Sequence, residues 1–147
     1  MQNILVPIDF SEISSRVVSL ANRLARQFGA KLWLIHVADP EPDFVGYDPG
    51  PATVRRQVAG RIHKEHSRLQ SIAEQVRLDG IDVTPLLVQG PTIDKILEEA
   101  GRIRADLIVV GSHGHGALYR ALVGGVCEGL LRRATHPVVV VPAVRPA

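Results

Sequence analysis

The chain has 147 residues and a formal net charge of +2, and it is 46% hydrophobic and 22% charged. This length predicts one domain, residues 1–147, with a sizeable core, and the single cysteine excludes an internal disulfide. A small net charge with only 4% aromatic residues gives no support to nucleic-acid binding, and we expect none. No apolar run approaches membrane length and the N-terminus lacks the apolar core of a signal peptide, so we expect a cytoplasmic protein without membrane association.

The first part of the chain predicts two strands with a helix between them. Residues 3–8 form a short apolar segment that ends at Asp9, which is the pattern of a buried strand. Apolar residues then recur at helical spacing until Gly29 stops the helix, and Ser11 is placed to cap its N-terminus. Residues 31–37, KLWLIHV, predict the second strand.

A loop and a long helix follow. Residues 39–51 are dense in proline, glycine and aspartate, and a loop of this length either folds over a ligand or varies freely. Apolar spacing across residues 53–78 predicts a long amphipathic helix. His63 and His66 lie three residues apart on it, but no carboxylate or cysteine completes a ligand set in register, so we expect no metal site. His36, near the end of the second strand, is assigned a structural role.

The second half of the chain continues the alternation. Residues 81–89 predict a third strand, which Pro85 restricts to an edge position of a sheet. Pro91 then opens a third helix. Two β-branched apolar runs, residues 107–110 and 138–141, predict two further buried strands.

Between these last two strands lie a glycine-rich loop and a helix. Gly111 and Gly114 permit close approach by a ligand, and Gly124 and Gly125 precede a helix predicted over residues 126–134. The first turn of a helix has unpaired N–H groups and the positive end of the helix dipole, so a phosphate placed there is held by main chain. The alternative is that Gly124 and Gly125 only allow tight packing of the loop on the helix.

Five strands alternating with four helices predict a single-domain α/β fold on an open five-stranded parallel sheet. The edge proline suggests the strand order 3-2-1-4-5. In that order the first and fourth strands are neighbours whose connections leave to opposite faces, so a crevice opens at their carboxyl ends. The crevice residues are Pro7, Ile8 and Asp9 from the first strand and residues 111–116 from the fourth.

Several well-known catalytic and nucleotide-binding patterns are missing. The chain has no G-x-x-x-x-G-K-S/T phosphate loop, and its glycine-rich loop lacks the third glycine of the dinucleotide fingerprint and follows the wrong strand. Ser112 is not in a nucleophile elbow. We therefore name no catalytic residue.

Four segments carry a resemblance to a known family: ILVPIDFSE, LIHV, ADLIVVGSHG, and the block from Gly114 through THPVVVVP. Together with the glycine spacing, they resemble the ATP-binding members of the universal stress protein family across nearly the whole chain. The resemblance implies a universal stress protein domain with an adenine nucleotide alpha hydrolase-like, Rossmann-like fold. It also implies a role in the stress response, and ATP, with or without Mg²⁺, as ligand.

The resemblance also implies roles for individual residues. The aspartate after the first strand recognises adenine in that family, and the segment after the second strand lines the base. The signature glycines and the histidine between the first two contact ribose and phosphate, and the helix start takes the phosphates. Carried onto this chain, the site residues are Pro7, Ile8, Asp9, Val37, Val110, Gly111, His113, Gly114, Gly124, Gly125, Val126 and Cys127.

One position departs from the family pattern. Gly125 stands where the family has serine or threonine, whose hydroxyl helps to bind phosphate. Two functions therefore remain open: an ATP-binding regulatory module with at most slow hydrolysis, and a nucleotide-free interaction protein whose glycine loop is structural. In both, the exposed last strand, Val138 to Val141, predicts a homodimer through its edge.

Overall fold

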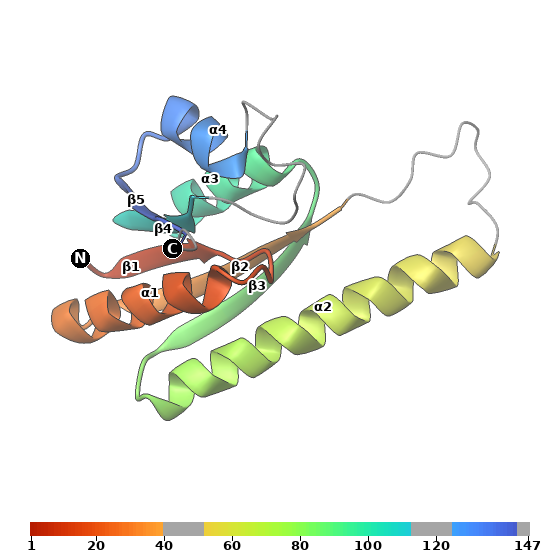
Figure 1. The fold of residues 1–147 in the computed structure, drawn as a ribbon, viewed down its shortest axis with the longest axis horizontal. Helices are drawn as coiled ribbons and strands as arrows, with labels where there is room; N and C mark the ends of the chain where they lie inside the picture. The colour runs from red at the N-terminus through yellow and green to blue at the C-terminus, as the bar shows by residue number, and fades with distance from the viewer. Residues whose placement is uncertain (40–51, 113–124, 144–147) are drawn as a thin grey trace.

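The computed structural model describes residues 1–39, 52–112 and 125–143. In these ranges five strands alternate with four helices in one parallel sheet of order β3-β2-β1-β4-β5, as predicted (Figure 1). The elements are β1 (Asn3–Pro7), α1 (Ser14–Phe28), β2 (Lys31–Ala38), α2 (Ala52–Leu78), β3 (Val83–Gln89), α3 (Thr92–Arg102), β4 (Leu107–Gly111), α4 (Val126–Arg133) and β5 (Val138–Val141).

The sheet is covered on both faces, α1 and α2 lying on one and α3 and α4 on the other (Figure 1). Strand β1 is central, and its alternate residues feed the two layers of core. Ile4 and Val6 pack toward α1 and α2, whereas Leu5 packs toward α3 and α4, and all three are fully buried. Burial on both faces explains why the strands read as continuous apolar runs rather than alternating ones. Among the described helices, none is long and apolar enough to cross a membrane.

The first helix begins later than predicted. The expected cap, Ser11, is wrong: α1 starts at Ser14, and Ser11 instead gives both its N–H and its hydroxyl to Asp9 Oδ1. Because the N–H and the hydroxyl of Ser11 are both bonded to Asp9 in that local turn, Ser11 does not cap the helix. The other end is as expected, because Gly29 takes a left-handed conformation (φ 62°) and its N–H donates to the carbonyl oxygen of Ala25.

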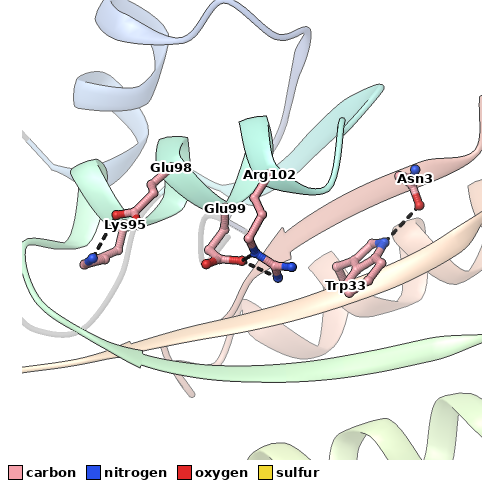
Figure 2. Close-up of polar contacts among 6 residues, drawn as sticks. All are labelled: Asn3, Trp33, Lys95, Glu98, Glu99 and Arg102. Carbon is pink, nitrogen blue, oxygen red and sulfur yellow. Dashed lines mark hydrogen bonds and ion pairs between the residues drawn. The ribbon is translucent and has the colours of Figure 1, made fainter.

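Trp33 of β2 contacts both β1 and α3, on the face of the sheet that α3 covers. Its indole Nε1–H donates to Asn3 Oδ1 at 3.0 Å, across the β1–β2 pair (Figure 2). The Arg102 guanidinium lies 6.0 Å from the Trp33 ring centroid and is itself paired with Glu99 on the same helix (Figure 2). The ring therefore packs against α3 while its polar edge is satisfied.

The two edges of the sheet also follow the prediction. Strand β3 carries Pro85 at one edge, in register with Leu34 of β2. At the other edge, the Ile108 and Ser112 N–H groups donate to the carbonyl oxygens of Pro137 and Val141 at 2.9 and 2.8 Å. Since alternate residues of a strand point to opposite sides, Val139 bonds inward to β4, whereas the N–H and C=O groups of Val138 and Val140 face the outer edge.

The start of β1 is held by Asp106, which precedes β4. Asp106 Oδ2 accepts the backbone N–H groups of Gln2 at 2.6 Å and Asn3 at 2.9 Å, and these bonds lower the pKa of its carboxyl group. A lowered folded pKa gives stability that is present above the unfolded value of about 3.9 and lost as the pH falls through the folded value.

Replacing this carboxylate tests that dependence. We expect Asp106→Ala to unfold at lower urea concentration than the parent near pH 7, with a difference that shrinks as the pH falls below about 4. Asp82→Ala, which removes an exposed carboxylate paired with Lys31 at 3.6 Å, is the control and should change stability little. A deficit of Asp106→Ala that is the same at both pH values would contradict this role.

Candidate functional site

A cavity of about 310 Å³ opens at the carboxyl ends of β1 and β4, where the predicted crevice lies. Its walls come from the ends of three strands, the beginnings of α3 and α4, and the first half of α1. Nine predicted site residues line it: Pro7, Ile8, Asp9, Val37, Val110, Gly111, Gly125, Val126 and Cys127. The other three, His113, Gly114 and Gly124, lie outside the described residues. The structure thus brings every predicted residue that it describes to one cavity.

Asp9 stands at the mouth of this cavity, directly after β1. Its Oδ1 accepts the Ser11 N–H at 2.9 Å, the Ser11 hydroxyl, and the Ser14 hydroxyl at 3.1 Å. Three donors on one oxygen fix the orientation of the carboxylate before any ligand arrives. The exposed carboxylate can therefore offer an acceptor to a ligand at low cost in side-chain entropy.

Gly111 ends β4 and has a packing reason to be glycine. A Cβ built there would lie 2.8 Å from Ile13 Cγ2, closer than real Cβ contacts come. Absence of a side chain lets the residue before α1 approach the strand, and both residues line the cavity. Gly111 therefore has a packing role, whether or not it also contacts a ligand.

Helix α4 points its N-terminus at the cavity. Gly125 occupies the N-cap position with extended backbone (φ −62°, ψ 168°), and its carbonyl oxygen accepts the Gly129 N–H at 3.0 Å. In the first turn, N–H groups have no intrahelical partner, and Val126 and Cys127 line the cavity there. The site therefore offers main-chain donors for an anion on the same cavity that the carboxylate of Asp9 lines.

Cys127 is half-buried in that first turn, and burial raises the pKa of its thiol. The neutral thiol adds no negative charge to the end of the cavity that suits an anion.

Several lining residues were missed by sequence reasoning. They are Ile13, Ser14, Val17, Ile35, His36, Thr92 and Ile96, whereas Ser112, which also lines the cavity, belongs to the predicted crevice range 111–116. Thr92 could have been found, because α3 begins just after β3 and the carboxyl ends of parallel strands share one edge of the sheet. Val17 and Ile96 come from faces of α1 and α3 whose approach to the crevice depends on packing. Among the described residues, no three His, Cys, Asp or Glu side chains gather as a metal site.

Comparison with known proteins assigns the family. Residues 1–142 match the model of the universal stress protein family. A universal stress protein of Methanocaldococcus jannaschii is 31% identical over 142 residues, covering 95% of this chain and 81% of the relative.

Two solved structures extend the comparison to the fold. A universal stress protein in complex with cAMP is 25% identical, with a TM-score of 0.72 and 96% of each chain covered. The Archaeoglobus fulgidus universal stress protein in complex with dAMP is 21% identical, with a TM-score of 0.70 and coverage of 95% of this chain and 97% of that one. The family match along nearly the whole sequence and the shared parallel sheet agree, and the chain belongs to the universal stress protein family.

Proposed function

We propose that this protein binds ATP in the cavity between the ends of β1 and β4 and acts as a regulatory module of the stress response. The observation that carries the proposal is the meeting of Asp9 and the α4 N-terminus on one cavity of about 310 Å³. A carboxylate acceptor suits the exocyclic amine of adenine, and helix N–H groups suit phosphate. The cAMP complex of the relative that is 25% identical supports an adenine nucleotide as the ligand class.

Each part of the ligand then has a counterpart in the cavity. The adenine amine donates to Asp9, and the flat base lies against the apolar wall that includes Ile8 and Val37. The phosphates lie at Gly125 and Val126, where the first turn of α4 supplies N–H groups. No lysine or arginine is among the described lining residues, and we expect any turnover to be slow.

Native mass spectrometry of the purified protein, followed by calorimetric titration, tests the proposal. We expect a co-purified adenine nucleotide, or binding of added ATP with and without Mg²⁺, and weaker binding of GTP. GTP is the control because its base presents a carbonyl oxygen where adenine has the amine, so it would face the Asp9 carboxylate with an acceptor. Failure to bind ATP under both conditions would overturn the proposal.

Gly125 gives a direct test of the phosphate end. Its backbone conformation, φ −62° and ψ 168°, is open to any residue and typical of a serine N-cap. We expect Gly125→Ser to tighten ATP binding by about tenfold, because a hydroxyl–phosphate hydrogen bond is worth about 1.5 kcal/mol or more.

Gly125→Ala is the matched control, since it adds the Cβ without the hydroxyl. It should bind ATP no more tightly than the parent in the same calorimetric titration. Equal gains in both variants would show that reduced backbone freedom, rather than the hydroxyl, improves binding. Weaker binding by a folded Gly125→Ser protein would contradict the position given to the phosphates.

The second candidate function, a nucleotide-free homodimeric interaction protein, rests on a different observation. Strand β5 lies at an edge of the sheet and directs the backbone groups of Val138 and Val140 outward. Pairing of this strand with its copy in a second chain would satisfy those groups in a closed two-fold contact. We propose such a homodimer, with or without bound nucleotide.

A further inference from the structure

A buried histidine lies beside the cavity and binds the end of β1. His36 is on β2, its side chain is 11% exposed, and its Nδ1 is 2.7 Å from the carbonyl oxygen of Ile8. A carbonyl oxygen can only accept, so Nδ1 carries a hydrogen and donates it. The second ring nitrogen, Nε2, is then without a hydrogen unless the ring is protonated.

Nε2 faces a carboxylate. Glu65 of α2 places Oε2 3.4 Å from His36 Nε2, and its side chain is only 21% exposed. Both atoms are shielded from solvent, and neither has a hydrogen-bond partner within the ranges that the structure describes. A neutral imidazole beside an ionised Glu65 would therefore put two acceptors face to face, at the cost of two unsatisfied buried groups. One proton between them changes this contact into a charge-assisted pair.

The same imidazole also contacts the residue on the other side of Asp9. The Phe10 ring centroid lies 4.4 Å from that of His36, and the Arg68 guanidinium of α2 lies 4.3 Å from the Phe10 ring. Phe10 has φ 60°, a left-handed conformation that a bulky side chain rarely adopts. Such a conformation persists when surrounding contacts hold it. His36 thus contacts both neighbours of Asp9: it donates to the carbonyl oxygen of Ile8, and its ring packs against the ring of Phe10.

We infer that His36 is a positioning residue for Asp9, and that one proton held between His36 and Glu65 makes adenine-nucleotide affinity dependent on pH. This inference rests on the proposed function. When the proton is present, Glu65 fixes the imidazole, the imidazole fixes Ile8 and Phe10, and Asp9 presents its carboxylate to the base. When the proton leaves, the contact between His36 and Glu65 becomes repulsive, and the imidazole that contacts Ile8 and Phe10 is held less firmly.

Other charged groups surround this pair. Asp9 follows Ile8 directly, Arg68 lies over Phe10, and Asp39, one residue after β2, pairs with Arg61 of α2 at 4.0 Å. The only charged side chain that the described residues place on Nε2 is Glu65. Glu65 is therefore the residue to change.

The variant Glu65→Gln tests whether the contact with His36 depends on a shared proton. A glutamine amide can donate N–H to the neutral Nε2, so the variant keeps the contact without needing the shared proton. Between about pH 5.5 and about pH 8.5, we expect the ATP affinity of the parent to fall by roughly three- to tenfold relative to that of Glu65→Gln. A change of this size corresponds to the free energy of one modest hydrogen bond. The titration of ATP itself cancels in this ratio. Glu74→Gln is the control on the same helix, because Glu74 is 63% exposed and pairs with Arg77; it should follow the parent at every pH.

A second measurement does not depend on nucleotide. Nitrogen-detected NMR of the free protein should show His36 with hydrogen on Nδ1 at high pH and on both nitrogens at low pH, and Glu65→Gln should shift that transition. A ring with hydrogen on Nε2 alone, or a transition that Glu65→Gln leaves unchanged, would overturn the shared proton. Identical pH profiles for ATP binding by parent and Glu65→Gln would overturn the link to affinity. A parent that binds no nucleotide would refute the proposed function and that link together, while the spectra would still decide on the proton.

Discussion

Asp9→Ala is expected to weaken ATP binding by about 10- to 100-fold while the domain remains folded. The loss follows from removing an ionised acceptor for the adenine amine, a contact worth about 1.5–3 kcal/mol. The fold should survive because Asp9 is exposed and follows β1 rather than lying within it. Isothermal titration calorimetry measures the affinity, and a thermal melt checks the fold.

Asp9→Asn is the matched control. Its side-chain oxygen can still accept from Ser11 N–H and from the Ser14 hydroxyl, so the turn before α1 is kept while the charge is removed. We expect an affinity between those of the parent and Asp9→Ala. If Asp9→Ala binds ATP as tightly as the parent, adenine is not read by this carboxylate and the ligand lies elsewhere in the cavity.

Val140→Pro is expected to convert the proposed dimer into monomer. Val140 directs its N–H to the outer edge of β5, so proline there removes a donor from the dimer contact but none from the bonds to β4. The pyrrolidine ring also blocks the approach of a second strand. Sedimentation of parent and variant at micromolar concentration measures the change.

Val139→Pro is the comparison that isolates the edge. Its N–H points inward to β4, so this variant breaks the sheet itself and should be insoluble or unfolded. A folded Val140→Pro monomer beside a misfolded Val139→Pro protein would support pairing through β5. A parent that sediments as a monomer would show that no dimer forms, and a Val140→Pro variant that remains dimeric would place the interface on another surface.

The order of the sheet was predictable because a few residues restrict it. Pro85 cannot sit in a central strand, and it does lie at the β3 edge. The start of α1 was not predictable in the same way. Ser11 is a residue type that favours the N-cap, but its N–H and hydroxyl bind Asp9 Oδ1 in a turn, and Ile13 takes the N-cap position before Ser14.

The candidate site was also predictable only in part. Its loop residues could be named because their types and spacing resemble a known family, and the strand ends bring them together. The walls could not be named: Ile96 belongs to the core stripe of α3, and only the packing of that helix shows that the stripe reaches the cavity. The contact between His36 and Glu65 joins residues 29 positions apart across two elements, and no local pattern indicates it.

The great length of α2 has a consequence for local unfolding. The helix has 27 residues, about 40 Å at 1.5 Å per residue, yet its buried residues, Leu69, Ala73 and Val76, all lie in its C-terminal half, and its first turns project past the sheet (Figure 1). Amide hydrogens should therefore exchange quickly near Ala52 and slowly around Ala73. Glu65 lies one turn before Leu69, so we expect the fast-exchanging part of the helix to end near its contact with His36. We therefore expect the boundary between fast and slow exchange to shift toward Leu69 when the proton proposed between His36 and Glu65 is lost.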